Sequence, residues 1–400
     1  MPSHAARRQA AVALDLLRVL EKEVVLRDQV LDQYLSGYYR QHREFGARDR
    51  RFFSALAFAW FRWRGWLPAP TAPDALQGAL AWLLDASAPH PAIAHMLTLT
   101  QHASSAPQPL GAAALAAKAN GLGQWLNIPP PPLAALAPAW LAPALFYPPE
   151  LSRAEHQQRC WQAFQTRPPT WLRAPQASAA QVLASLQKQY PAACHSRLTS
   201  AISLPSGISK EILQQMPELE IQDLASQAVG LCCAPQTGEA WWDACAGSGG
   251  KSFHLAALLA GGGAVVATDI RETMRQAGQR RLARNRLRNI TFQAWDGSAA
   301  TAPRRAFNGV LLDAPCSGIG TWPRNPDARW RTRAEQITTY ASLQGQLLRV
   351  CAQKLQAGGR LVYAVCTLTQ AETVAVIEAF LADRPDFKLE PMAHPLTGQP

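Results

Sequence analysis

The spacing of hydrophobic residues separates a helical first part of the chain from a last part in which two kinds of segment alternate. In residues 5–125, apolar positions such as Leu17, Leu20 and Val24 recur at helical intervals, with charged residues on the other faces. Residues 52–60 are apolar almost all round, which predicts a helix buried on every side. We therefore expect residues 1–142 to form an all-helical domain.

A proline-dense stretch, residues 129–149, follows the helical part. Proline cannot continue a helix and stiffens extended chain, so this stretch predicts a linker. Residues 168–173 then indicate a strand and residues 180–189 a helix. We expect residues 143–228 to comprise the linker and a small α+β module.

From residue 226 onward, short apolar runs alternate with helical segments. Four runs predict strands, at residues 240–244, 264–268, 310–313 and 360–365. This alternation is typical of a parallel sheet with crossover helices, which binds ligands at the carboxyl ends of its strands. Residues 229–400 are therefore predicted to form an α/β Rossmann-like domain.

The composition indicates a negatively charged partner and argues against several classes of protein. A net charge of +11 and a pI near 9.5 favour a polyanionic partner such as nucleic acid. No apolar run reaches the roughly 20 residues that span a bilayer, and the first ten residues lead into no apolar signal segment. The eight cysteines lack zinc-type C-x-x-C spacing. We expect a cytoplasmic protein with free thiols, no metal site and no membrane association.

Basic and aromatic residues interleave between residues 48 and 66. Guanidinium and indole planes stack on RNA bases while arginine neutralises phosphate, so the stretch suits RNA binding. The alternative is a helix whose aromatic residues are core and whose arginines form its solvated rim. The sequence is compatible with both. The residues concerned are Arg48, Arg50, Arg51, Trp60, Arg62, Trp63, Arg64 and Trp66.

Two further groups of arginines lie in the C-terminal part. Arg280, Arg284 and Arg288 follow one another at four-residue steps, which on a helix places like charges on one face. A face that binds phosphate has this pattern, so these residues favour contact with RNA, whose target base must then leave its stack. The remaining members are Arg271, Arg275, Arg281 and Arg286, and then Arg324, Arg329, Arg331 and Arg333.

A glycine-rich loop follows the first predicted strand of the C-terminal domain. It comprises Cys245, Ala246, Gly247, Ser248, Gly249, Gly250 and Lys251. Its glycines allow tight turns and close approach to a ligand at a helix N-terminus. A Walker A loop would need glycine where Cys245 stands, and a dinucleotide fingerprint would need a third glycine further along. The remaining interpretation is a loop that binds S-adenosylmethionine.

Two acidic residues extend this interpretation. Asp269 ends the second predicted strand, where a carboxylate can accept hydrogen bonds from both ribose hydroxyls of a cofactor. Asp296 closes the next unit and could accept from the adenine amino group. Either acid alone could merely cap a turn, but in this order the two predict a cofactor site.

Two thiols and an acid stand at predicted strand ends. Asp313 and Cys316 follow one strand, and Cys366 follows another. Because adjacent strands lie about 4.8 Å apart, both thiols could face one pocket if these strands are neighbours. We interpret the other cysteines as small hydrophobic residues, namely Cys160, Cys194, Cys232, Cys233 and Cys351.

This combination suits methylation at C5 of a cytosine, a carbon too weakly nucleophilic to take a methyl group unaided. A thiolate that adds to C6 makes C5 nucleophilic. An acid stabilises charge at N3, and a second group removes the C5 proton so that the thiol can leave. The chemistry alone does not say which cysteine attacks.

Several of these blocks together resemble the RsmB/NSUN family of RNA cytosine-C5 methyltransferases, over residues 222–378. The matching blocks are residues 222–227, 243–251, Asp269, Asp296, 313–318, 324–327 and 363–368. The resemblance implies a class I methyltransferase domain that uses S-adenosylmethionine. It implies that Cys366 is the nucleophile, that Cys316 assists release, and that Asp313 contacts the cytosine ring or the cofactor. Lys251 would serve the cofactor pocket or the target base.

Residues 45–51 and 61–64 resemble the NusB-like domain of the bacterial RsmB branch. This implies 16S ribosomal RNA as the favoured substrate of a monomeric enzyme, with transfer RNA as the alternative. Two departures, Gly247-Ser248 in the loop and the absence of Asn-Glu after Glu372, leave open an RNA-binding assembly factor with impaired catalysis. Methylation of an exocyclic base nitrogen is disfavoured, because its Asn/Asp-Pro-Pro-aromatic block is replaced by residues 313–316.

Overall fold

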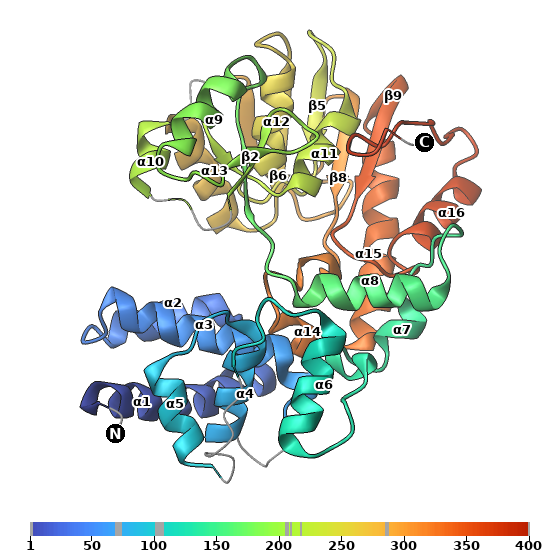
Figure 1. The fold of residues 1–400 in the computed structure, drawn as a ribbon. Helices are drawn as coiled ribbons and strands as arrows, with labels where there is room; N and C mark the ends of the chain where they lie inside the picture. Colours follow the sequence, from blue (N-terminus) through green and yellow to red (C-terminus); the bar gives the residue numbers. More distant parts are fainter. Residues whose placement is uncertain are drawn as a thin grey trace. The chain divides into compact units, whose positions relative to one another are not determined.

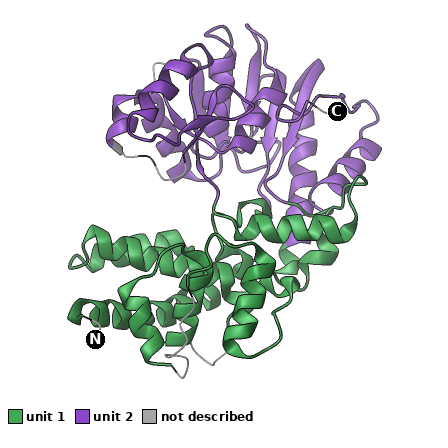
Figure 2. Cartoon of the chain, viewed as in Figure 1, with its two compact units in different colours: residues 1–167, 318–336, 368–370 green, residues 168–317, 337–367, 371–400 purple. Residues whose placement is uncertain are grey.

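The computed structural model describes residues 3–68, 74–100, 108–204, 208, 210–216, 218–284 and 288–398. The chain divides into two compact units (Figure 2). Unit 1 comprises Met1–Arg167, Gly318–Gln336 and Leu368–Gln370, and unit 2 comprises Pro168–Ser317, Ile337–Thr367 and Ala371–Pro400. The domain boundaries expected after residues 142 and 228 remain predictions.

Unit 1 is built from helices (Figure 1). Its first helix begins where the Ser3 side chain accepts a hydrogen bond from the backbone N–H of Ala6, and it buries Ala10, Leu14 and Leu17 at helical spacing. The elements are α1 His4–Leu20, η1 Glu21–Leu26, α2 Leu31–Gln41, α3 Ala47–Trp63, η2 Arg64–Trp66, α4 Ala75–Asp85, α5 Pro91–Thr98, α6 Leu115–Leu126, η4 Leu133–Leu136, α7 Leu141–Ala144, α8 Arg153–Gln165, η6 Ile319–Thr321 and α14 Ala328–Arg331. No described helix of the chain is both long and apolar enough to cross a membrane.

The tryptophans of the basic-aromatic stretch belong to the core of unit 1. Trp60, Trp63 and Trp66 are at most 4% exposed, so they are not available to stack on RNA bases. Arg62 is 2% exposed and pairs with Asp85 at 2.9 Å. The second interpretation is therefore correct for the tryptophans, which form core, but wrong for Arg62, which is buried and not part of a solvated rim.

A buried arginine fixes the segment Gly318–Gln336 within unit 1. The Arg329 guanidinium is 0% exposed and donates to the backbone carbonyls of Arg62, Leu136 and Phe164 at 3.3, 2.7 and 3.0 Å. Burial lowers the pKa of Arg329 to about 9. Since this side chain lies in the core, the expectation that Arg329 contacts RNA is wrong.

Unit 2 begins with a four-stranded antiparallel sheet in the order β2-β3-β1-β4. Its apolar face packs against α9 and α10, through Val182, Leu186 and Ile212 among others. The elements are β1 Thr170–Arg173, η5 Gln176–Ser178, α9 Ala179–Gln187, β2 Cys194–His195, β3 Ala201–Leu204, α10 Lys210–Gln215 and β4 Glu220–Ile221.

A five-stranded parallel sheet in the order β7-β6-β5-β8-β9 completes unit 2. The strand order reverses between β5 and β8, which is where ligands bind in such sheets. The elements are α11 Leu224–Cys233, β5 Ala240–Asp243, α12 Gly250–Leu258, β6 Ala264–Asp269, α13 Glu272–Arg284, β7 Ile290–Ala294, β8 Phe307–Asp313, α15 Ala334–Ala352, β9 Leu355–Ala364 and α16 Val374–Asp383. The predicted Rossmann-like sheet is thus confirmed.

Helices cover both faces of this sheet, and neighbouring tryptophans of β5 point to opposite sides. Trp242 packs with residues of α15 and α16, such as Leu348 and Phe380. Trp241 packs with residues of α11 and α12, such as Cys233 and Leu255. Alternation along the strand therefore anchors β5 in two cores at once.

The helix after Asp269 is shorter than the arginine spacing suggests. Since α13 ends at Arg284, Arg288 does not share a helix face with Arg280, and that part of the prediction is wrong. Arg286 lies outside the described residues.

Replacing Gly309 of β8 by alanine should destabilise the parallel sheet. The added Cβ would lie 2.3 Å from the buried Trp241 ring, which cannot move without disturbing the core. We expect Gly309→Ala to lower the free energy of unfolding by about 2 kcal/mol in urea titrations. The control is Gly37→Ala in α2, where the new Cβ meets only the end of the Arg40 side chain at 4.0 Å. Equal effects of the two changes would contradict the packing argument.

Candidate active site

Pairing of β8 with β9 brings the two candidate thiols together. The strands are parallel neighbours, and Asp313 at the end of β8 lies opposite Ala364 at the end of β9. The loops that follow carry Cys316 and Cys366, whose Sγ atoms lie 3.4 Å apart. The sequence predicted a shared pocket for the two thiols only if these strands are neighbours. The structure shows that they are.

The pKa of Cys366 is shifted in the opposite direction from that of five other cysteines. A hydrogen bond from Cys316 lowers the pKa of the Cys366 thiol, against the opposing effects of desolvation and of the Asp313 carboxylate. Lys251 also lowers it. A thiol with a lowered pKa reaches the nucleophilic thiolate form more readily. Burial instead raises the pKa values of Cys160, Cys232, Cys233, Cys245 and Cys351.

An ion pair lies beside the thiols. Lys251 Nζ is 2.7 Å from an oxygen of Asp313 and 3.2 Å from the Ser226 hydroxyl. Burial favours a lower pKa for Lys251, but the charge and the hydrogen bond of Asp313 raise it above its usual value. The Asp313 side chain is still 33% exposed, so a ligand can reach the carboxylate.

The glycine-rich loop connects β5 to the N-terminus of α12. Gly247 and Gly249 have φ values of +57° and +87°, a region that other residues adopt only at a cost. Arg281 donates to the carbonyl and the hydroxyl of Ser248 at 3.0 and 3.2 Å, and Gln222 donates to the Gly250 carbonyl at 3.3 Å. The loop is thus held from both sides, and Arg281 is part of this support.

A cavity of about 220 Å³ opens between this loop and the end of β8. Asp243 is one of its lining residues and is fully buried, and one of its oxygens accepts from the Ser252 hydroxyl at 2.6 Å. The other oxygen has no hydrogen-bond partner among the described residues. Complete burial raises the pKa of Asp243 to about 7. The other lining residues include Asp223, Ser226, Cys245, Ala246, Gly250, Lys251 and Asp313.

The two predicted cofactor acids have different surroundings. Asp269, 5% exposed, accepts from the backbone N–H of Gly247 at 2.9 Å and from Arg271 through its backbone and side chain. It therefore connects the strand end to the loop. Asp296 is exposed, and its carboxylate accepts from Ser298 and Thr301 within a turn. In this structure Asp296 stabilises a turn, and its contact with a cofactor remains a prediction.

Comparison with known proteins now bears on this arrangement. Residues 231–399 match the family model of the 16S rRNA methyltransferases RsmB/F. The ribosomal RNA small subunit methyltransferase B of Thermus thermophilus is 40% identical over 177 residues, which cover 44% of this chain and 43% of the relative. Over residues 231–399 the chain is therefore similar to the RsmB/F methyltransferases. The chain spans between 39 and 61% of the length of the curated relatives that it matches.

Solved structures extend the likeness in fold beyond the RsmB/F region. The crystal structure of PH0851 aligns with 95% of this chain and 91% of its own, with a TM-score of 0.70 and 21% identity. NSun6 from Pyrococcus horikoshii, solved with SFG, aligns with 61% of this chain and 87% of its own, with a TM-score of 0.55 and 16% identity. At these identities the comparison shows a shared fold.

The structure adds supporting residues that the sequence did not assign to the candidate site. Gln222 and Ser226 contact the glycine loop and Lys251, although the sequence marked their block only by resemblance. Glu372 is 0% exposed and lies between the two cysteine loops. Its single signal in the sequence was its place after Cys366. Among the described residues, no group of three or more histidines, cysteines or acids could hold a metal ion.

Removing Cys316 should raise the pH at which Cys366 becomes reactive. The hydrogen bond from Cys316 lowers the pKa of Cys366, so Cys316→Ala should shift the midpoint of alkylation by iodoacetamide to higher pH. The measurement is the rate of modification of the Cys366 peptide, followed by mass spectrometry from pH 6 to about 10, a range that brackets the ordinary thiol pKa. As a control, Cys194→Ala removes an exposed thiol of the other sheet. A midpoint that stays the same or falls in Cys316→Ala would refute the assigned cause.

Proposed function

We propose that this protein methylates C5 of a cytosine in RNA, with 16S ribosomal RNA as the favoured substrate. The observation that carries the proposal is the pair of sulfurs 3.4 Å apart on the loops after β8 and β9, with Asp313 at the end of β8. A single thiol would serve for attack on the base. A second thiol at this distance gives the site a separate group for release.

In the proposed cycle Cys366 is the nucleophile. Its thiolate forms a bond to C6 of the cytosine, and the displaced electron pair moves into the ring. The pair of Asp313 with Lys251 would stabilise the charge that develops on the ring near N3. C5 becomes nucleophilic as a result. S-adenosylmethionine, when bound, supplies the electrophilic methyl group.

Cys316 acts in the second half of the cycle. Once C5 carries the methyl group, its proton must leave before the ring can expel the Cys366 sulfur. After Cys366 has become a thioether, Cys316 gives up its own proton to solvent. As a thiolate it then accepts the C5 proton, the C5–C6 double bond returns, and the bond from the Cys366 sulfur to C6 breaks. The contact between the two sulfurs supports this role, because it would put the base beside the bond that has to break.

The cavity beside the glycine loop fits the methyl donor. The positive φ values of Gly247 and Gly249 turn the loop around the amide end of α12, which suits a carboxylate. The buried oxygen of Asp243 that has no partner among the described residues suits an ammonium group. Asp269 would hold the ribose, and Asp296 the adenine. The SFG in the NSun6 structure, an analogue of S-adenosylmethionine, agrees with this assignment.

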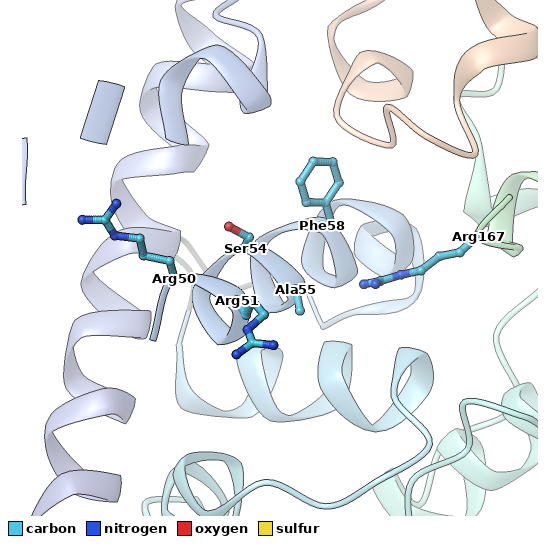
Figure 3. A pocket seen from close by; sticks show the side chains of 6 residues that line it. All are labelled: Arg50, Arg51, Ser54, Ala55, Phe58 and Arg167. Atoms are coloured by element: carbon cyan, nitrogen blue, oxygen red, sulfur yellow. The ribbon is translucent and has the colours of Figure 1, made fainter. Parts of the chain in front are cut away.

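Unit 1 offers a surface for the RNA backbone. Arg50, Arg51 and Arg167 line a cavity of about 350 Å³ together with Ser54, Ala55 and Phe58 (Figure 3). No acidic residue belongs to this lining, but Arg167 pairs with Asp85 at 2.9 Å. Arg51 uses its Nε for a backbone carbonyl. Arginine groups that keep free N–H donors are suited to phosphate. The names of the curated relatives favour small-subunit ribosomal RNA as the source of that phosphate.

Cys316→Ala should convert the enzyme into one that stays attached to its RNA. Attack by Cys366 needs no second thiol, whereas release does, so a covalent protein–RNA complex should accumulate. Cys366→Ala should abolish both the complex and the product. The measurement is a denaturing gel with a transcript of small-subunit ribosomal RNA, together with bisulfite sequencing. Full activity of Cys366→Ala would refute the mechanism, and a transfer RNA that is methylated in place of the transcript would correct the substrate.

Arg51→Gln should weaken RNA binding without altering the chemistry. Loss of one phosphate contact should reduce the slope of log K against log salt by about 0.7–0.9. Fluorescence anisotropy with the same ribosomal transcript, at several potassium chloride concentrations, measures this slope. Arg18→Gln is the matched control, because Arg18 is an exposed residue of α1 paired with Asp15 and remote in sequence from the cavity. Equal slopes for the two variants would remove this surface from the RNA interface.

A further inference from the structure

One buried carboxylate joins the two loops that carry the thiols. We propose that Glu372 is a positioning residue that sets the separation of Cys316 and Cys366. The inference deepens the proposed function and rests on it for its catalytic meaning. The contacts that carry it lie entirely within unit 2.

Glu372 accepts hydrogen bonds from the residue that follows each cysteine. Its Oε1 accepts from the backbone N–H of Ser317 at 2.8 Å, and its Oε2 accepts from the Ser317 hydroxyl at 2.6 Å. The Thr367 hydroxyl donates to the same Oε2 at 3.2 Å. Since Ser317 follows Cys316 and Thr367 follows Cys366, this side chain spans the gap between the loops.

The two hydroxyls also contact one another, which fixes the direction of the donors. Ser317 Oγ and Thr367 Oγ1 lie 2.7 Å apart. Each hydroxyl has one proton, so Ser317 gives its proton to Glu372, and Thr367 shares its single proton between Ser317 Oγ and Glu372 Oε2. This order requires a pure acceptor at position 372. A carboxylate satisfies that requirement because both of its oxygens only accept. The amide of glutamine would instead place an NH2 donor against groups that are themselves donors.

A glutamine of α15 holds Cys316 from its other side. Gln344 is 0% exposed, and its Nε2 donates to the Pro315 carbonyl at 2.8 Å and to Glu372 Oε1 at 3.2 Å. The residues before and after Cys316 are therefore both restrained. The Tyr363 hydroxyl donates to the Glu372 carbonyl at 2.8 Å and so ties the backbone of Glu372 to β9.

The consequence is a fixed geometry for two thiols that stand on loops. Parallel pairing ends at Asp313 and Ala364, so the ladder itself does not restrain the cysteines. A displacement of about 1 Å in a catalytic group can cost about 100-fold in rate. Glu372 restrains the two loops relative to one another. It does so through two hydrogen bonds from Ser317 and one from Thr367.

A cross-linking experiment tests this placement without RNA or methyl donor. Diamide takes up two hydrogens from two thiols, which then join as a disulfide, at a rate that depends on how close the sulfurs are held. In the full-length chain, Cys316 and Cys366 should cross-link readily, as measured by mass spectrometry of the joined peptides. We expect Glu372→Gln to slow this reaction about tenfold or more. The matched control, Glu378→Gln on the exposed side of α16, should react like the wild type.

A second variant and a second readout guard against simple unfolding. Ser317→Ala removes the hydroxyl between the two loops and should slow cross-linking in the same direction while Glu372 is retained. In turnover assays with the ribosomal transcript, Glu372→Gln should lower kcat and leave the KM for S-adenosylmethionine near its original value. If Glu372 had only a general structural role, the Glu372→Gln variant would show a raised KM for S-adenosylmethionine as well as a lowered kcat.

The outcomes separate the two hypotheses. Cross-linking of Glu372→Gln within twofold of the wild type would overturn the positioning role, and so would loss of kcat together with a raised KM for S-adenosylmethionine. A wild-type protein that cross-links rapidly but makes no 5-methylcytosine in any RNA would overturn the proposed function. In that case slow cross-linking in Glu372→Gln would still support the placement of the thiols by Glu372.

Discussion

The parallel ladder between β8 and β9 is the constraint on which the active site depends. It places Asp313 opposite Ala364, so the two loops that leave the sheet start side by side. The thiol contact follows from this pairing together with the buried hydrogen bonds beyond it. Without that register, the acid, the attacking thiol and the second thiol would belong to unrelated surfaces. The ladder is in turn secured by a tryptophan-rich core on both faces of the sheet.

Much of this site could be predicted because the relevant residues directly follow hydrophobic runs. Cys316, Cys366 and Asp313 each stand at or near the end of a strand that its apolar pattern reveals. Strand order is a different matter, since no local pattern shows that β8 and β9 are neighbours. From the sequence, the contact between the sulfurs could therefore be predicted only on the condition that these two strands pair. Glu372 escaped assignment because its partners are backbone and hydroxyl groups brought together by tertiary structure.

The arginines show where charge patterns alone mislead. In the sequence Arg329 is one of several basic residues that follow the Cys316 block. In the structure its guanidinium is buried in the core of unit 1 and donates to backbone carbonyls. Arg281 and Arg271 support the glycine loop and Asp269, respectively. A positive net charge favours binding to polyanions. It does not distinguish arginines exposed to solvent from buried arginines that donate to backbone carbonyls. Burial makes that distinction, and it leaves Arg50 and Arg51 as the better candidates for contact with RNA.

The interleaving of the two units has a consequence for the order in which the protein can fold. Unit 1 takes its first 167 residues from the start of the chain, but it also contains Gly318–Gln336 and Leu368–Gln370. The carbonyls of Leu136 and Phe164 accept from the Arg329 guanidinium, which is made long after them. During synthesis on the ribosome, the helices made first must therefore wait, incompletely packed, until most of the second unit has been translated. The helical unit reaches its final packing late, although its helices are the first part of the chain to emerge.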